Sequence, residues 1–179
     1  AETVTNPSLE IADLEKLAQI AHAHGVPFIV DNTFPTPINC RPIEWGADVV
    51  THSTTKYMDG HAQTTGGAIV DGGTFDWTNG KFPEFCEPDP TYHGVVYTRK
   101  FGRAAYVVKA RVQLMRDIGA QQNPFAAYVI NLGLETLHLR MPRHCSNALA
   151  VAKHLEKHPR VAWVNYPGLE KNPFHALAQ

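Results

Sequence analysis

The stretch V-P-F-I-V-D-N-T-F-P-T-P-I-N-C-R-P-I-E-W-G-A-D-V-V-T-H-S-T-T-K, residues 26–56, contains two short apolar runs that indicate the fold. Residues 26–31 and 47–51 have the length and the β-branched content of buried strands, and residues 41–46 between them read as a helical turn closed by glycine. A further apolar run follows at 66–70. Because such runs alternate with helical segments, the sequence predicts an α/β fold with a mostly parallel sheet flanked by helices.

Helical spacing of apolar residues predicts four helices around this sheet. The chain opens on what reads as the end of a strand and passes at Asn6-Pro7-Ser8, a cap with an early proline, into a first helix that ends at Gly25. Three further helices are expected at about 101–118, 124–138 and 142–157.

The second half of the sequence predicts a change of organisation. Residues 72–94 are rich in Gly, Pro, Asp and aromatic residues, which indicates a long irregular excursion inside the domain. Residues 161–166, V-A-W-V-N-Y, have the composition of a strand. We therefore interpret residues 1–141 as part of one large domain and residues 142–179 as a connecting helix and the truncated start of a C-terminal α/β domain.

Composition limits the classes of function. The chain has 179 residues, of which 44% are apolar, as in ordinary globular proteins. Its net charge is −1, and it lacks the stripe of basic residues that would bind nucleic acid or a membrane surface. A small molecule or a second copy of the chain is the expected partner. The cysteines are odd in number and widely spaced, and the histidines show no zinc-binding spacing, so we expect a reducing compartment, the cytoplasm, and no metal. The cysteines are Cys40, Cys86 and Cys145.

Two of the predicted strands end beside residues that can do chemistry. In an open α/β sheet, ligands bind beyond the carboxyl ends of the strands, and Asp31 closes one run while Ser53, Thr55 and Lys56 follow the next. A carboxylate, hydroxyl groups and a primary amine are what pyridoxal phosphate requires, because its ring nitrogen pairs with a carboxylate, its phosphate accepts hydrogen bonds and its aldehyde condenses with a lysine. Hydroxyl residues before a lysine are common in turns, so the strand context carries this hypothesis.

Several longer motifs resemble one family. The sequence is similar to the cysteine and methionine metabolism family of pyridoxal-phosphate-dependent enzymes, fold type I, and within it to the O-acetylhomoserine sulfhydrylase branch. The motifs are I-V-D-N-T-F-P-T-P, R-P-I-E-W-G-A-D-V-V-T-H-S-T-T-K-Y-M-D-G-H, T-G-G-A-I-V, Y-H-G-V-V-Y, K-A-R-V-Q-L-M-R-D-I-G-A, N-L-G-L-E-T-L-H-L-R-M-P-R-H and V-N-Y-P-G-L.

The resemblance implies a role for five residues. Lys56 would hold pyridoxal 5′-phosphate covalently, Asp31 would pair with its ring nitrogen, and Ser53 and Thr55 would contact its phosphate. Asn6 would lie near the ring hydroxyl and the substrate carboxylate. The implied reaction is γ-replacement on O-acetyl-L-homoserine by sulfide or a small thiol, giving homocysteine or methionine plus acetate, in a homotetramer or dimer.

Two alternatives remain open at this point. A carbon–sulfur lyase of the same family, of the methionine γ-lyase or cystathionine lyase type, would share the same motifs. The family's chains are longer, so the sequence reads as a central portion of one, and a non-catalytic fragment without cofactor is the second alternative.

Other charged or aromatic residues are interpreted as structural. We expect Arg140, like Arg111 and Arg116, to lie on a solvated helix face or to form ion pairs between subunits. His52 is expected to pack or to make a hydrogen bond, and Tyr57, beside the lysine, to pack.

Overall fold

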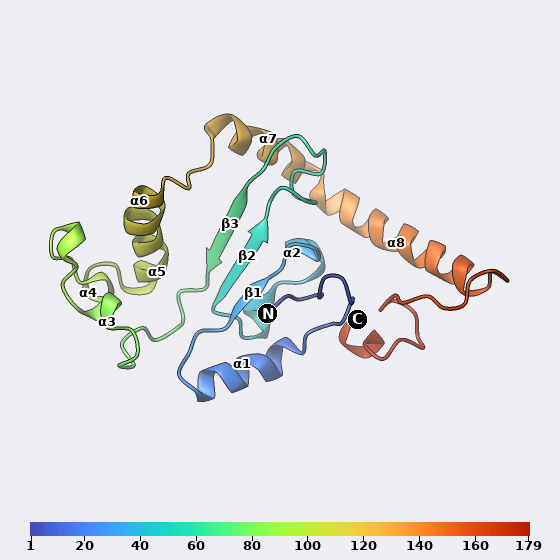
Figure 1. Ribbon diagram of the computed structural model, residues 1–179, viewed down its shortest axis with the longest axis horizontal. Helices are drawn as coiled ribbons and strands as arrows, with labels where there is room; N and C mark the ends of the chain where they lie inside the picture. The colour runs from blue at the N-terminus through green and yellow to red at the C-terminus, as the bar shows by residue number, and fades with distance from the viewer.

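A computed structural model describes residues 1–179 and has a three-stranded sheet at its centre (Figure 1). Strands β1 (Ile29–Asp31) and β2 (Val49–Ser53) run parallel, and Asp31 is level with Thr51 of β2. Strand β3 (Gly67–Asp71) pairs antiparallel with β2, so that the sheet has the order β1-β2-β3 and is mixed. The three predicted strands are therefore present, each shifted by a few residues.

The N-terminal residues extend this sheet beyond β1. Glu2 forms a parallel bridge with Asp31. The amide of Asp31 donates to the carbonyl of Ala1 at 2.8 Å, and the amide of Thr3 donates to the carbonyl of Asp31 at 3.0 Å. The chain therefore opens with an isolated parallel bridge to β1, in place of the strand end that the sequence predicts.

The first helix begins later than predicted. Helix α1 spans Leu14–Ala23, and its cap is Asp13, whose carboxylate accepts from the amide of Lys16 at 3.1 Å. The expected start at Asn6-Pro7-Ser8 is wrong because residues 5–12 fold back on the N-terminal segment. There the amide of Thr5 donates to Glu10 and the amide of Ala12 donates to Thr3, which uses backbone groups that a helix would need.

The largest core cluster covers the face of the sheet that carries Val30 and Val50. The core joins two residues of α1 to residues of the first two strands and their flanks: Leu14, Ala18, Phe28, Val30, Ala47 and Val50. The rest of the molecule is open: its accessible surface is 11405 Å², whereas a compact monomer of 19.8 kDa exposes about 8,600 Å². At the sheet edge, Ile69 and Val70 of β3 are 52% and 44% exposed.

The remaining helices are mostly short. They are α2 (Thr36–Asn39), η1 (Pro42–Trp45), α3 (Pro83–Cys86), η2 (Pro90–Tyr92), α4 (Tyr97–Phe101), η3 (Gly102–Ala104), α5 (Ala105–Lys109), the π-helical η4 (Ala110–Met115), α6 (Arg116–Ile118), α7 (Pro124–Glu135), α8 (Leu137–Glu156) and η5 (His175–Leu177). The predicted turn at 41–46 is η1, which Gly46 closes in the left-handed conformation at φ 94°. None of the helices is both long enough and apolar enough to span a membrane.

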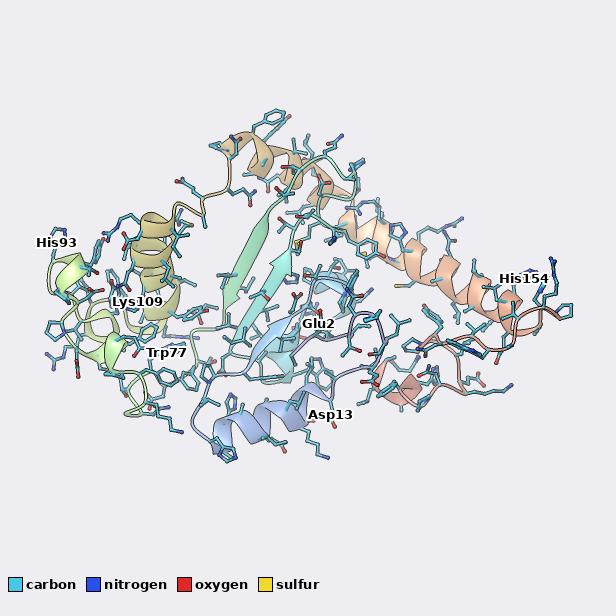
Figure 2. All side chains as sticks on the ribbon, viewed as in Figure 1. Glu2, Asp13, Trp77, His93, Lys109 and His154 are labelled. Carbon is cyan, nitrogen blue, oxygen red and sulfur yellow. The ribbon has the colours of Figure 1, made fainter.

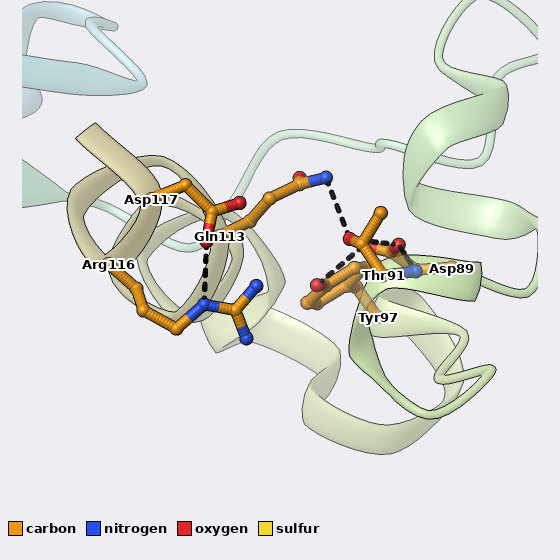
Figure 3. Close-up of polar contacts among 6 residues, drawn as sticks. All are labelled: Asp89, Thr91, Tyr97, Gln113, Arg116 and Asp117. Atoms are coloured by element: carbon orange, nitrogen blue, oxygen red, sulfur yellow. Dashed lines mark hydrogen bonds and ion pairs between the residues drawn. The ribbon is translucent and has the colours of Figure 1, made fainter.

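The predicted excursion at 72–94 is mostly irregular but well packed. Its aromatic side chains join those of α4 and α5 in an aromatic cluster, in which Trp77, Phe85 and Tyr97 are buried and the partly buried Tyr106 packs against them. The ring of Trp77 stacks on Phe85 and Tyr106 at centroid distances of 4.5 and 5.2 Å. Asp89 lies against this cluster, where Tyr97 and Thr91 donate to it (Figure 3).

Two predictions for the C-terminal part are wrong. Helix α8 does not start at Pro142 but includes it, five residues after its first residue, Leu137. A proline there removes only the single hydrogen bond to the carbonyl four residues earlier, which a long helix tolerates. Residues 161–166 form no strand, because an extended segment needs a neighbouring strand and none pairs with them.

The C-terminal segment instead returns to the start of the chain. In Figure 1 it runs back from the far end of α8 toward the N-terminal loop, and the side-chain amide of Asn165 donates to the carbonyl of Ser8 at 2.9 Å. The division of the chain into residues 1–141 and 142–179 stays a prediction, and α8 passes through that boundary.

Candidate functional site

The candidate site lies at the sheet edge where β1 and β2 end together. The two strands are parallel with Asp31 level with Thr51, so Asp31 and Ser53 emerge at the same edge. Lys56 follows three residues after Ser53, in a turn that covers residues 54–59. Figure 2 labels Glu2, whose backbone is bridged to Asp31 and which marks the N-terminal segment beside β1.

Thr33 orients the carboxylate of Asp31. The amide of Thr33 donates to Oδ1 of Asp31 at 2.9 Å, and its hydroxyl oxygen accepts from the amide of Ser53 at 2.8 Å. Thr33 is buried, and it ties the end of β1 to the end of β2. The second carboxylate oxygen of Asp31 has no hydrogen-bond partner in the chain and is free to bind a ligand. The D-N-T sequence, with an amide two residues after an aspartate, is the local signal for this turn.

The hydroxyl groups between β2 and the lysine differ in their partners. The hydroxyl of Thr55 accepts from the amide of Gly66 at 3.0 Å and donates to the Gly66 carbonyl at 3.3 Å. The hydroxyl of Ser53 has no partner in the chain, and that of Thr54 is buried without one. The hydrogen bond from the Thr55 hydroxyl to the Gly66 carbonyl is long, so this hydroxyl can donate instead to an anionic ligand, because hydrogen bonds to charged groups are shorter and stronger.

Lys56 presents its amine to solvent on a fixed backbone. Its side chain is exposed and makes no hydrogen bond or ion pair with the chain. Within the turn, the amide of Gly60 donates to the carbonyl of Lys56 at 2.8 Å, and the amide of Asp59 donates to Thr54 at 2.9 Å. The turn is therefore closed by its own backbone, while the amine can bind a ligand.

Asn6 emerges at the same edge as Asp31. Glu2 is bridged in parallel to Asp31, so the residues after it leave the sheet on the side where β1 ends. The amide of Asn6 donates to the carboxylate of Glu2 at 3.0 Å, and its own side chain is exposed.

His52 lies on the face of the sheet opposite to the side chains of Thr51 and Ser53. It is buried, and it alternates along β2 with Thr51 and Ser53. Burial lowers the pKa of His52, since a charged imidazole would lose its hydration there. The expectation that His52 packs is confirmed by its burial.

The sequence interpretation missed Arg140. Its guanidinium donates to the carbonyls of Tyr57 at 2.8 Å and Gly133 at 2.7 Å, and to the hydroxyl of Thr136 at 3.0 Å. The interpretation of Arg140 as surface charge is therefore wrong. No local signal could have found it, because Tyr57 is 83 residues away in sequence. The expectation for Tyr57 is confirmed, since it packs on the cluster of Met58, Leu137 and Met141.

Comparison with known proteins defines the class to which this fold and site belong. A profile of the family described as Cys/Met metabolism PLP-dependent enzyme matches residues 1–179. The chain belongs to this family, whose cofactor is pyridoxal phosphate, as predicted.

Individual relatives are more specific. A homocysteine synthase of Schizosaccharomyces pombe is 53% identical over 99% of this chain, and an O-acetyl-L-homoserine sulfhydrylase of Leptospira meyeri is 48% identical over 100% of it. Each match covers 42% of the relative, so the chain spans about two fifths of the length of these proteins.

Solved structures confirm the predicted fold class. A putative O-acetylhomoserine (thiol)-lyase of Campylobacter jejuni, which contains N′-pyridoxyl-lysine-5′-monophosphate, superposes with a TM-score of 0.93 at 37% identity and covers 99% of this chain and 44% of its own. An O-acetylhomoserine sulfhydrylase of Wolinella succinogenes gives 0.86 at 36% identity, covering 99% of this chain and 48% of its own.

The free groups at the sheet edge fit pyridoxal phosphate. One oxygen of Asp31, the hydroxyl of Ser53 and the amine of Lys56 have no partner in the chain. These are a carboxylate, a hydroxyl and a primary amine, the chemical types that the ring nitrogen, the phosphate and the aldehyde of the cofactor bind.

Proposed function

We propose that the full-length protein that contains this chain catalyses γ-replacement on O-acetyl-L-homoserine. Sulfide or a small thiol adds at the γ carbon as acetate leaves, which gives homocysteine or methionine. The activities for which the relatives are named support the substrate and the reaction.

Five residues carry roles in this proposal. Lys56 binds the cofactor through its amine, then takes the proton from the α carbon of the substrate and moves a proton at the β carbon. Asp31 pairs with the protonated ring nitrogen, Ser53 and Thr55 hold the phosphate, and Asn6 binds near the substrate carboxylate. The bound cofactor supplies an electron sink for this chemistry.

The observation that carries the proposal is the register of β1 and β2. Because Asp31 is level with Thr51, its carboxylate and the turn that holds Lys56 lie at one edge of the sheet. Thr33 then couples the two ends through its amide and its hydroxyl. This arrangement supports one ligand that binds the carboxylate and the amine together.

The experiment compares the full-length protein with its Lys56→Ala and Lys16→Ala variants. We expect Lys56→Ala to lose the visible absorption band of lysine-bound cofactor and at least about 100-fold of homocysteine formation from O-acetylhomoserine and sulfide. Lys16, an exposed lysine of α1, is the matched control and should leave both unchanged. A band that survives in Lys56→Ala would contradict the assignment of Lys56.

The same preparation separates replacement from elimination. Turnover of methionine or cystathionine to a keto acid, without turnover of O-acetylhomoserine plus sulfide, would identify the protein as a lyase. A full-length protein that binds no cofactor would support a non-catalytic role.

The assembly and the compartment are part of the proposal. Large exposed apolar side chains, such as Phe125 at 72% and Ile118 at 74%, support association with further copies. The three cysteines are free thiols, which supports a reducing compartment, the cytoplasm. Sedimentation velocity and fractionation of the full-length protein test these two points.

A further inference from the structure

We propose that Arg140 is a positioning residue, which fixes the backbone beside Lys56 so that the lysine amine meets the cofactor. The inference rests on the proposed function of Lys56. It assigns to α8 a part in the site through the backbone of the turn that holds Lys56.

The contacts of Arg140 require a guanidinium. Its Nη1 donates to the carbonyl of Tyr57, its Nη2 to the carbonyl of Gly133, and its Nε to the hydroxyl of Thr136, at 2.8, 2.7 and 3.0 Å. Three acceptors from two distant segments thus bind one planar group. A lysine at this position has a single ammonium and could not reach all three in this geometry.

The residue that Arg140 holds is the neighbour of Lys56. Tyr57 follows Lys56 directly, so its carbonyl belongs to the peptide unit one residue past the lysine. The guanidinium lies so close to Gly60 that a Cβ there would be 2.6 Å from Nη1. Arg140 therefore covers the C-terminal half of the turn that displays the lysine.

The second contact connects this turn to the junction of α7 and α8. Gly133 lies in the last turn of α7, where its carbonyl accepts long hydrogen bonds of 3.4 Å from the amide and the hydroxyl of Thr136, and the guanidinium adds a shorter one of 2.7 Å. A Cβ on Gly133 would lie 2.3 Å from the carbonyl oxygens of Met58 and Asp59. The two backbones thus touch, and Arg140 is the charged donor that binds both.

None of the other contacts of the turn binds the Tyr57 carbonyl. Met58 packs against Leu137 and Met141 of α8, and such apolar contacts have no direction. The hydrogen bonds inside the turn join Thr54 to Asp59 and Lys56 to Gly60. A charge-assisted hydrogen bond to the Tyr57 carbonyl is directional, so Arg140 is the group that sets this peptide.

The test uses the full-length protein and three variants. Arg140→Ala removes all three contacts, Arg140→Lys keeps the charge, and Arg143→Ala is the control on the same helix. Arg143 is exposed and its side chain makes no hydrogen bond or ion pair. Cofactor-free protein is mixed with pyridoxal phosphate, and the link to Lys56 is trapped with borohydride at set times and mapped by mass spectrometry.

We expect Arg140→Ala to form the Lys56 link about 10- to 100-fold more slowly and to lose a similar factor in kcat, with KM little changed. The midpoint pH of the absorption band of the bound cofactor should also shift. Ethylguanidinium added to Arg140→Ala should restore part of the trapping rate. Arg143→Ala should match the wild type in every measurement.

Two outcomes would overturn the inference separately from the proposed function. If the link forms at Lys56 in the wild type, and Arg140→Ala and Arg143→Ala trap at the same rate with the same midpoint pH, Arg140 is not a positioning residue. If Arg140→Ala does not fold, Arg140→Lys carries the test, and unchanged trapping in that variant rejects the inference. A link that maps to another lysine in the wild type rejects the proposed function itself.

Discussion

Asp31 at the sheet edge and Asp89 at the aromatic cluster show two uses of the same side chain. Oxygen Oδ1 of Asp89 accepts from the amide and the hydroxyl of Thr91 at 2.8 and 2.6 Å (Figure 3). Its Oδ2 accepts from the hydroxyl of Tyr97 at 2.8 Å and lies 3.6 Å from the ammonium of Lys109. The carboxylate of Asp31 accepts a hydrogen bond only from the amide of Thr33. The closed set of partners indicates that Asp89 is a structural carboxylate, whereas the open oxygen of Asp31 is available to a ligand.

The partners of Asp89 also fix its charge. The hydroxyl of Thr91, with help from Tyr97 and the Lys109 ammonium, lowers the pKa of Asp89 to about 2. Burial, followed by the hydrogen bond to Asp89, raises the pKa of Tyr97 to about 12. The ammonium of Lys109 lies 4.5 Å from the ring centroid of Tyr97. The network is therefore an ionised carboxylate whose hydrogen-bonding groups are all used within the cluster.

The largest expected effect comes from Asp31→Asn. The new amide oxygen can still accept from Thr33, but the negative charge that we propose pairs with the ring nitrogen is lost. We expect kcat of the full-length protein to fall about 100- to 1,000-fold while the thermal midpoint hardly changes. Steady-state assay and thermal unfolding check both parts, and an unchanged kcat would mean that Asp31 does not bind the cofactor.

Asp89→Ala should give the opposite pattern. It leaves the hydroxyl of Tyr97 and the largely buried ammonium of Lys109 without their partner, which should cost about 3 kcal/mol of local stability. Hydrogen exchange of residues 83–118 measures this loss. Borohydride trapping at Lys56 should proceed at the wild-type rate, and slow trapping would show that the two regions are coupled.

The pH dependence follows from the lowered pKa of Asp89. A carboxyl whose folded pKa is about 2, against about 3.9 when unfolded, stabilises the fold above about pH 4 and loses that contribution as the pH falls toward about 2. We expect the stability difference between wild type and Asp89→Asn to shrink by about 1 to 2 kcal/mol over that range, after allowance for screening by solvent. Urea unfolding at several pH values tests this, and a constant difference would contradict the lowered pKa.

Tyr97→Phe should have the smallest effect. It removes the hydroxyl that donates to Asp89 but keeps the buried ring, so we expect a loss of about 1 kcal/mol in hydrogen-exchange stability. Tyr92→Phe is the matched control, because Tyr92 stacks on Tyr97 at 6.3 Å and its hydroxyl makes no hydrogen bond. Equal effects of the two substitutions would mean that the hydroxyl contact with Asp89 contributes nothing.

Local patterns predicted the part of the fold that positions the site. The apolar runs that became β1 and β2 were readable because each is short, β-branched and bounded by turn residues. The position of Asp31 and Ser53 at the strand ends follows from the same runs. The residues at the ends of two parallel strands can thus be predicted without knowledge of the third strand. The antiparallel direction of β3 was not predicted by the pattern.

Contacts between distant segments could not be predicted in this way. The helix start depended on residues 5–12 folding back on the N-terminal segment, and the failed strand at 161–166 depended on a missing neighbour. Arg140 looked like any helical arginine, because its acceptor on Tyr57 is brought near only by the packing of Gly133 on the turn. The polar contacts between distant segments around the candidate site are therefore the part that the sequence predicts least well.

The unpaired edge of β3 makes the isolated chain prone to aggregation. An unpaired row of amide and carbonyl groups, on a strand whose Ile69 and Val70 are exposed, is a template on which another chain can continue the sheet. When the 179 residues are expressed alone, we expect copies to pair through this edge and aggregate, which lowers the concentration of protein that can bind a ligand. Light scattering must therefore come before any titration, since a loss of signal through aggregation would look the same as a loss of binding.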